Sequence, residues 1–264
     1  MEARSERHIG FEGINNFRDF GGLNTRDGEY VPLGRLYRSG HHARATLADC
    51  ARFAALGVAA AVDLREDSER REQPHAWLDL LSLELIADPG ISRDRLMPIP
   101  RPAQHGADVT AREMEAFLAT YYAAMPFDTR YMALFRQYFD RLASRNGPWL
   151  VHCSGGKDRT GVLVALTHHL LGVHPDDAMA DYLLSNLVGN EEERARRVGR
   201  YMSRLYGMSF SPEAVIALLR VDPRYLESAW SVIADRCGSI DRYLVDVLGV
   251  DASKSDDIRK RLLR

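Results

Sequence analysis

A thiol and a guanidinium stand six positions apart in a short polar stretch between two apolar runs. The stretch reads Cys153-Ser-Gly-Gly-Lys-Asp-Arg159, which is a C-x5-R spacing. The apolar residues Trp149–Val151 before it predict a strand, and the apolar residues after Thr160 predict a helix. If the loop between them wraps into a nest, its backbone N–H groups from Ser154 to Arg159 converge with those of the helix start. This geometry predicts a site for a tetrahedral oxyanion.

The residue types in the loop fit attack on a bound phosphate ester. Gly155 and Gly156 permit the close backbone approach and any positive φ that the wrap requires. Arg159 can hold two oxygens at once, which a lysine cannot do. The same positive field favours the thiolate of Cys153, the nucleophilic form of cysteine. We expect Cys153 to attack phosphorus in line, releasing an alcohol and leaving a cysteinyl phosphate for hydrolysis. The residues expected to bind the phosphate are Ser154, Gly155, Gly156, Lys157, Asp158, Arg159 and Thr160.

Together with other short motifs, this loop is similar to a known family. HCxxGKDRTG resembles the signature of the cysteine-dependent phosphatases, specifically the bacterial tyrosine and dual-specificity group, which includes mycobacterial enzymes. Asn16–Asp19 and Gly34–Ser39 match the NFRD and GRLYRS elements of that group, Val62–Arg65 matches its DLR, and Ala180–Asn186 matches its ADYLxSN. The resemblance therefore covers nearly the whole chain.

The resemblance implies an α/β phosphatase fold with a small, mostly parallel central sheet flanked by helices. It implies no metal and no cofactor, and activity on phosphotyrosine that extends to phosphoserine, phosphothreonine and phosphoinositides, with inorganic phosphate as product. Lys157 and Asp158 are its mark of this wider specificity. Physically, Lys157 places a cation at the rim, suited to a second phosphate on an inositol ring. Asp158 is expected to orient Arg159 or a neighbouring side chain, or to share in proton transfer. The Thr160 hydroxyl is expected to hydrogen-bond the thiolate that departs in the second step.

Three aspartates are candidates for the acid that protonates the leaving group. Related phosphatases take it from an aspartate just past the strand that follows the DLR strand, and Leu83–Ala87 followed by Asp88 places Asp88 there. The match is imperfect because the family pattern has Pro-Asp, whereas this chain has Ala-Asp-Pro. Asp63 and Asp158 remain the alternatives.

Further residues are expected to support the loop. His152 is expected to hydrogen-bond the loop rather than to act as a base. Asp63 is expected to form a strand-end salt bridge with Arg65. For Asn16, Arg18 and Asp19 two interpretations stay open, a structural turn network or part of the wall of the site.

The elements that position these residues follow from hydrophobic periodicity and from start signals. Val58–Leu64 and Leu83–Ala87 are predicted strands, and Asp128–Arg145 is a predicted amphipathic helix. Helix starts are predicted at Thr46, Pro175, Asn190, Ser211 and Asp251. After Val151 the chain is predicted to be almost entirely helical. We expect a single phosphatase domain over residues 1–264, with lid insertions at about 90–127 and 176–210.

Composition restricts the partners. The 264 residues carry a net charge of −2, which gives no general attraction to nucleic acid or to anionic membranes. The three cysteines are far apart and include no CxxC, which favours a reducing compartment. The N-terminus lacks an apolar signal core, and the longest apolar helix is too short to span a bilayer. We expect a cytoplasmic protein without stable membrane insertion, with secretion by a route that needs no cleavable signal left open.

Two other classes of protein use similar loops. A phosphate-binding pseudophosphatase would keep the nest and turn nothing over. A sulfurtransferase or an arsenate reductase would use the same nest on a different anion.

Overall fold

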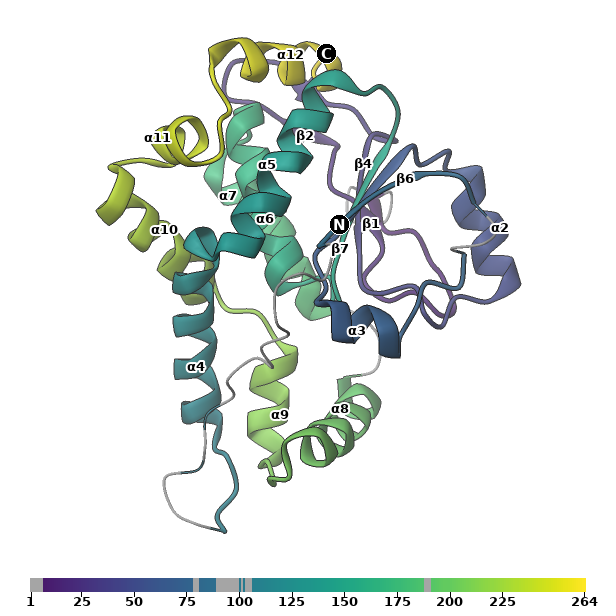
Figure 1. The fold of residues 1–264 in the computed structure, drawn as a ribbon, viewed down its shortest axis with the longest axis vertical. Helices are drawn as coiled ribbons and strands as arrows, with labels where there is room; N and C mark the ends of the chain where they lie inside the picture. The colour runs from purple at the N-terminus through teal and green to yellow at the C-terminus, as the bar shows by residue number, and fades with distance from the viewer. Residues whose placement is uncertain (1–6, 78–80, 89–99, 101, 103–105, 188–190) are drawn as a thin grey trace.

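A five-stranded sheet forms the centre of the molecule (Figure 1). The computed structural model describes residues 7–264 except 78–80, 89–99, 101, 103–105 and 188–190. The strands, in their order across the sheet, are β1 (Arg18–Asp19), β4 (Leu36–Ser39), β7 (Trp149–His152), β5 (Ala60–Asp63) and β6 (Glu84–Ala87). All neighbouring pairs are parallel except β1 with β4. The predicted α/β class with a mostly parallel sheet is confirmed, as are the three predicted strands.

The register of the parallel strands brings their carboxyl ends together. Ser39, His152, Asp63 and Ala87 occupy one row across β4, β7, β5 and β6. The next residues along each strand, among them Cys153 and Asp88, therefore leave the sheet at the same edge. Ligands of open parallel sheets bind at this edge.

Alternate strand residues face two hydrophobic cores. Val62 and Val151 point into the larger core, which helices build, whereas Ala61 and Leu150 point into a smaller core with Phe53. Every residue of β4, β5 and β7 is buried, as expected for parallel strands covered on both faces. Figure 1 shows α2 on one side of the sheet and α5 and α6 on the other.

The helices are α2 (Leu47–Ala55), α3 (Asp67–Glu72), α4 (Ala111–Ala124), α5 (Thr129–Ser144), α6 (Asp158–Leu171), α7 (Pro175–Leu183), α8 (Glu191–Tyr206), α9 (Pro212–Leu219), α10 (Pro223–Cys237), α11 (Ile240–Arg242) and α12 (Ala252–Leu262). Short 3-10 or π turns follow at Met125–Phe127, Leu184–Leu187 and Tyr243–Val247, and β2 (Leu23–Asn24) pairs with β3 (Tyr30–Val31). Predicted starts at Thr46, Ser211 and Asp251 are confirmed, because each side chain accepts a backbone N–H at its helix start. Asp128 caps α5 in the same way, and α7 begins at the predicted Pro175. The start predicted at Asn190 lies outside the described residues, and α8 begins at Glu191.

One predicted boundary is wrong. We expected the helix after the loop to start near Thr160, but α6 starts at Asp158 with Lys157 as its N-cap residue. Gly156 has φ +66°, and this left-handed turn lets the chain enter the helix two residues earlier.

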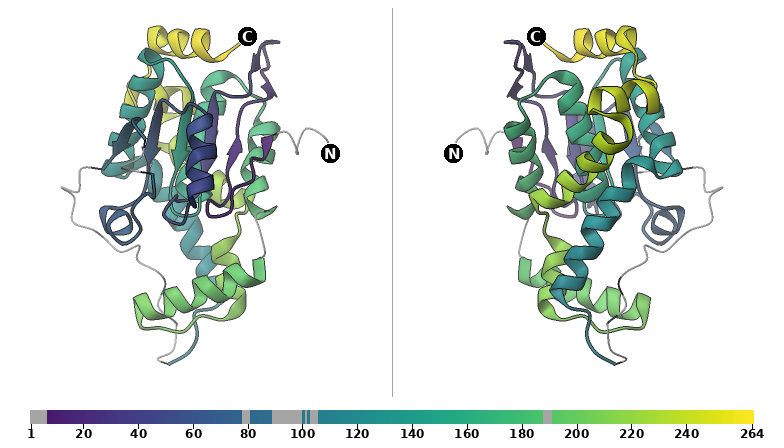
Figure 2. Two further views of the ribbon diagram at one scale, coloured as in Figure 1. Left: turned by 90° about the vertical axis from the view of Figure 1, so that its right-hand side faces the viewer. Right: turned by 90° about the vertical axis from the view of Figure 1, so that its left-hand side faces the viewer.

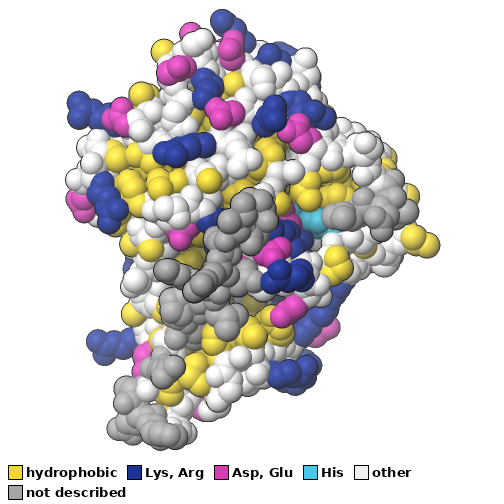
Figure 3. All heavy atoms as spheres, in the orientation of Figure 1, with side chains coloured by type: hydrophobic (Ala, Val, Ile, Leu, Met, Phe, Trp, Pro, Cys, Tyr) yellow, Lys and Arg dark blue, Asp and Glu magenta, His cyan; other side chains and the backbone are white. Residues whose placement is uncertain are grey.

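Helices α4, α8 and α9 extend away from the sheet (Figure 2). α4 packs against α9 and α10, and α8 packs against α9. They fall largely in or beside the two segments predicted as lid insertions, whose role as lids stays a prediction. On the face shown in Figure 3, acidic and basic side chains lie interspersed. Across the described ranges, no helix has both the length and the apolar character that crossing a membrane requires.

Candidate active site

Cys153 lies at the start of a tightly wrapped loop at the carboxyl end of β7. Its side chain is buried, and the Gly156 N–H donates to its Sγ at 3.3 Å. A Cβ at Gly156 would lie 2.2 Å from the Ser39 backbone, so only glycine fits this turn. The loop thus curls over the thiol and turns at least one N–H towards it.

The outer side of the loop is held by polar side chains from the N-terminal segment. Asn16 Nδ2 donates to the carbonyls of Gly155 and Gly156 at 3.2 and 2.8 Å, and Arg38 Nη2 donates to Gly156 O at 3.0 Å. Arg18 in turn donates to Asn16 Oδ1. Because these side chains bind the carbonyls of Gly155 and Gly156, the N–H side of this part of the loop can face Cys153 and an anion bound there. Of the two interpretations, Asn16 and Arg18 therefore fit the supporting network.

Asp181 on α7 gathers three arginines beneath this network. Arg38 and Arg18 lie 2.7 and 3.3 Å from its carboxylate, and Arg7 forms a third ion pair. Burial acts to raise the pKa of Asp181, but the three guanidinium groups hold it well below its usual range. Burial and the neighbouring Arg38 lower the pKa of Arg18 to about 9. The ADYLxSN motif thus acts here as the anchor of the arginines behind the loop.

Glu69 on α3 is a site residue that the sequence did not reveal. Both its oxygens bind Arg159, with Nη1 at 2.5 Å and Nη2 at 2.8 Å, and Ser154 Oγ also donates to it. Arg159 Nη1 further donates to Leu64 O at 3.2 Å. Burial acts to raise the pKa of Glu69, but Arg159 and Ser154 lower it to about 2. The sequence feature that could have pointed to Glu69 is the charged run after β5, which begins at the same edge of the sheet as the loop.

Asp63 forms a buried cluster with Arg65 and two histidines. Its carboxylate accepts from Arg65 Nη2 at 2.8 Å, Arg65 Nε at 3.0 Å and His75 Nε2 at 3.0 Å. This confirms the predicted salt bridge with Arg65. Burial acts to raise the pKa of Asp63, yet His152, His75 and Arg65 hold it well below its usual range. A carboxyl group held ionised in this way is a poor proton donor, which weakens Asp63 as the general acid.

His152 lies against the Asp63 cluster at the start of the loop. Its ring lies edge-on to His75, with centroids 4.8 Å apart, and its Nδ1 lies 3.8 Å from Asp63 Oδ1. The predicted hydrogen bond from this ring to the loop stays a prediction. Asp63, His75 and His152 hold potential metal-ligand atoms within 4.8 Å of one another. Arg65 already binds both oxygens of Asp63, so a cation there would meet a guanidinium.

Lys157 and Asp158, the residues before Arg159 in the loop, form an ion pair. Lys157 is only 6% exposed, and its Nζ donates to Asp158 Oδ1 at 2.7 Å. The Tyr122 hydroxyl also donates to Asp158 Oδ1, at 2.8 Å. The ammonium is thus paired with the adjacent carboxylate, and the predicted role of Lys157 at the rim of the site stays a prediction. Of the roles predicted for Asp158, orienting a neighbouring side chain agrees with these contacts.

Asp88 follows β6 at the edge of the sheet where Cys153 follows β7. The residues that directly follow β6, β5 and β7 are Asp88, Leu64 and Cys153. Asp88 and Cys153 are therefore separated by two strand spacings of about 4.8 Å each, with Leu64 between them. Asp88 is 8% exposed, and its carbonyl accepts from Arg70. Its role as the acid stays a prediction. So does that of Thr160, whose buried hydroxyl has no hydrogen-bond partner among the described residues.

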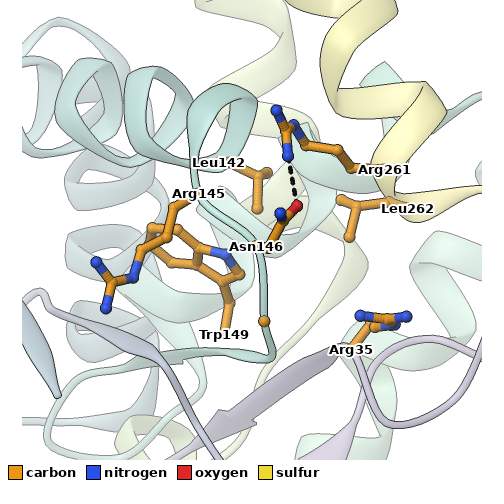
Figure 4. A pocket seen from close by; sticks show the side chains of 8 residues that line it. Arg35, Leu142, Arg145, Asn146, Trp149, Arg261 and Leu262 are labelled. Carbon is orange, nitrogen blue, oxygen red and sulfur yellow. Dashed lines mark hydrogen bonds between the residues drawn. The ribbon is translucent and has the colours of Figure 1, made fainter.

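A separate pocket lies at the opposite end of β7 (Figure 4). Its lining includes Trp149, the first residue of the strand, whereas Cys153 follows the last. Arg145 pairs with Glu84 at 2.9 Å, and Arg261 donates to Asn146. The pocket is therefore distinct from the anion-binding loop.

Comparison with known proteins decides the family. The sequence profile of the tyrosine phosphatase family matches residues 9–264. The chain belongs to the tyrosine phosphatase family. Its relatives include the Cupriavidus necator protein H16_A0669, assigned by its name to the tyrosine-protein phosphatases, which is 34% identical over 94% of this chain and 87% of that protein. The triple specificity protein phosphatase PtpB of Mycobacterium tuberculosis is 28% identical over 95% of this chain and 97% of that protein.

These matches confirm the resemblance recognised in the motifs. This tyrosine phosphatase is accordingly an enzyme, and the loop around Cys153 lies at the carboxyl end of β7. The solved structure of TpbA from P. aeruginosa matches at 20% identity with a TM-score of 0.31, covering 72% of this chain and 89% of that chain. This likeness is too slight to add to the assignment.

Proposed function

We propose that this tyrosine phosphatase hydrolyses phosphate monoesters through a cysteinyl-phosphate intermediate, without a metal ion. The observation that carries the proposal is the buried Cys153 Sγ with the Gly156 N–H at 3.3 Å, at the base of a loop whose carbonyls are bound on the outside. In the first step Sγ bonds to phosphorus as the ester oxygen leaves and takes a proton. In the second, water attacks phosphorus, gives up a proton, and releases inorganic phosphate and the thiolate.

Arg159 and the loop N–H groups stabilise the charge on the equatorial oxygens in both steps. Glu69 supports this assignment because it binds both terminal nitrogens of Arg159 and so fixes the orientation of the guanidinium group. Asp88 supplies the proton to the leaving oxygen in the first step. Its place at the carboxyl end of β6 favours this role, and the ionised state of Asp63 leaves that rival less suited to it.

The substrates we propose are phosphotyrosine proteins, with phosphoserine, phosphothreonine and phosphoinositides in addition. Lys157 supports the wider range, because it belongs to the loop and its ammonium, held by Asp158, is a cation that a second phosphate could bind. The relative PtpB bears the name of a triple specificity phosphatase. A second phosphate beside the scissile one would compete with Asp158 for the Lys157 ammonium.

The first test is turnover of a phosphotyrosine peptide by purified protein, with and without EDTA. We expect vanadate-sensitive release of phosphate that EDTA leaves unchanged and that Cys153→Ser abolishes. Full activity of Cys153→Ser, or loss of activity on chelation, would overturn the proposal. Absence of any turnover would favour a pseudophosphatase, and thiosulfate:cyanide activity would favour a sulfurtransferase.

An arsenate reductase requires resolving thiols, and Cys50 does not offer one readily. Cys50 packs in the smaller core with Phe53, whereas Cys153 belongs to the larger core on the other face of the sheet. This arrangement leaves Cys50 poorly placed to resolve an intermediate on Cys153.

Substrate breadth is tested by the kcat/KM values for a phosphotyrosine peptide, a phosphothreonine peptide and mono- and bisphosphorylated inositides. Lys157→Ala is expected to reduce activity most on bisphosphates. Lys254→Ala is the matched control, since Lys254 binds Asp140 and the Gly249 carbonyl outside the site. A uniform loss across substrates in Lys157→Ala would assign Lys157 to the loop structure alone.

A further inference from the structure

The Lys157–Asp158 pair is connected to two helices outside the loop by a chain of hydroxyl groups. Tyr122 on α4 donates to Asp158 Oδ1 at 2.8 Å, and Tyr182 on α7 donates to the Tyr122 hydroxyl at 2.8 Å. Both tyrosine side chains are almost fully buried. A hydrogen-bonded chain of this kind fixes the position of its last acceptor.

Asp158 Oδ1 is shared between Tyr122 and Lys157. The Lys157 ammonium donates to it at 2.7 Å, and its other contact, with the Arg220 carbonyl, is longer at 3.4 Å. The carboxylate is therefore the main tether of the ammonium. Any displacement of Asp158 moves the only lysine of the loop with it.

A glycine on α6 makes room for this chain of hydrogen-bonded hydroxyl groups. A Cβ at Gly161, in the first turn of α6, would lie 2.9 Å from the ring of Tyr182, so glycine permits the close approach of α7. Burial and the negative Asp158 raise the pKa of Tyr122 well above its usual range. The Tyr122 hydroxyl thus stays protonated and remains a donor to Asp158 throughout the physiological pH range.

We propose that Tyr122 is a positioning residue for substrate selectivity, holding Asp158 so that Lys157 is placed to receive a second phosphate next to the scissile one. This inference rests on the role proposed above for Lys157. Tyr122 acts through the carboxylate and does not touch the phosphate. Its contribution is largest for bisphosphorylated substrates and small for simple phosphotyrosine, which needs only the loop and Arg159.

The test compares Tyr122→Phe with the parent enzyme on a short-chain bisphosphorylated inositide, a monophosphorylated inositide and a phosphotyrosine peptide. Phenylalanine keeps the volume of the ring and removes only the hydroxyl. One hydrogen bond to a charged group is lost, so we expect kcat/KM for the bisphosphate to fall about three- to tenfold, mainly through KM, and the peptide to change less than about twofold. Tyr182→Phe, one link further away, should show a smaller change in the same direction.

Tyr138→Phe is the matched control. Tyr138 is also buried with a hydrogen-bonded hydroxyl, but it pairs with Thr167 and packs on Trp149 at the far end of β7. It should leave the ratio of bisphosphate to peptide activity unchanged. Thermal melting of all variants measures the loss of stability separately from the change in selectivity.

A double-mutant cycle distinguishes positioning from a general structural role. In the Lys157→Met background, Tyr122→Phe should have no further effect on the selectivity ratio. Additive effects, or an equal loss on all substrates, would overturn the role of Tyr122 while leaving Lys157 in place. Unchanged selectivity in Lys157→Met itself would instead overturn the role of Lys157, and the inference about Tyr122 with it.

Discussion

The carboxylate of Glu69 binds both terminal nitrogens of Arg159, at 2.5 and 2.8 Å, and accepts from the Ser154 hydroxyl as well. One acidic side chain on α3 thus joins the last residue of the C-x5-R stretch to the residue after the nucleophile. The guanidinium plane is fixed before substrate binds, so its ordering does not have to take place in the transition state.

Replacement of Glu69 by glutamine should therefore impair catalysis. Glutamine can accept from Arg159 through one oxygen only, so we expect kcat/KM on phosphotyrosine peptide to fall by about ten- to a hundredfold. The pKa of Glu69 is about 2, so the carboxylate stays ionised over the assay range and the loss should be constant between pH 5 and 8. Glu72→Gln on the same helix, whose partner is Tyr201 on α8, is the control. Equal activity of the two variants would contradict the role of Glu69.

The loss of kcat on replacing Asp88 should depend on the leaving group of the substrate. Asp88→Asn is expected to lower kcat by about 10²- to 10⁴-fold on alkyl phosphates, which need an acid, and far less on activated aryl phosphates. Steady-state kinetics over a series of leaving groups measures this slope. A parallel loss on phenyl and alkyl phosphates would assign Asp88 to structure and favour Asp158 as the acid.

The two loop glycines should differ in their tolerance of alanine. At Gly156 the φ of +66° and the 2.2 Å approach to Ser39 leave no room for a Cβ, so Gly156→Ala should cost about 2 kcal/mol or more of unfolding free energy, and most activity. At Gly155 a Cβ would meet only the Lys157 side chain, at 3.6 Å. Gly155→Ala should therefore fold normally. Urea denaturation and phosphatase assays compare them, and similar stabilities would count against the close packing on Ser39.

Asp181 is expected to be essential for stability. Asp181→Asn leaves the guanidinium groups of Arg7, Arg18 and Arg38 without their shared counter-charge in a buried site, which we expect to cost about 3–5 kcal/mol. Asp177→Asn, at an exposed position of the same helix, should change stability by less than about 0.5 kcal/mol. Chemical denaturation followed by tryptophan fluorescence gives both values. A cost near zero at Asp181 would mean that the arginines find other partners.

Buried histidines behind the loop should make the enzyme sensitive to acid. Trp77 Nε1 can only donate, so His42 Nδ1 accepts its hydrogen bond at 2.7 Å and Nε2 carries the proton towards Ser39 Oγ at 2.9 Å. Burial and the neighbouring His152 and His75 lower the pKa of His42 well below its usual value. The unfolded chain therefore takes up a proton first as the pH falls below about 6.5, and the folded state loses stability.

The measurement is the unfolding free energy at several pH values between 7.5 and 5. His42→Asn lacks the titrating group, so its unfolding free energy should fall less steeply as the pH is lowered. The slope of the variant should be smaller than that of the parent enzyme by up to about 1.4 kcal/mol per pH unit. The slope is the readout, which a uniform destabilisation of the variant does not alter. Identical slopes would show that His42 does not contribute to the acid sensitivity.

The local sequence determined the anion loop and most of the strands and helix starts around it. Cys153 and Arg159 at C-x5-R spacing, between a strand and a helix, define the anion loop because such a loop is built from consecutive backbone N–H groups. The strands and most helix starts were predictable for the same reason, since periodicity and capping act over a few residues. Even the supporting role of Asn16 was among the interpretations that the sequence allowed.

Only the tertiary structure decided which distant side chains complete the site. Glu69 meets Arg159 because β5 and β7 are neighbours in the sheet and α3 follows β5 at the loop edge. Tyr122 meets Asp158 because α4 packs on the larger core, and Lys157 is drawn inward by that same carboxylate. No spacing along the chain encodes these pairs, because each depends on the order of the strands and on which face a helix covers. The sequence thus determined the nucleophile and its loop, whereas the fold selected the groups that orient them.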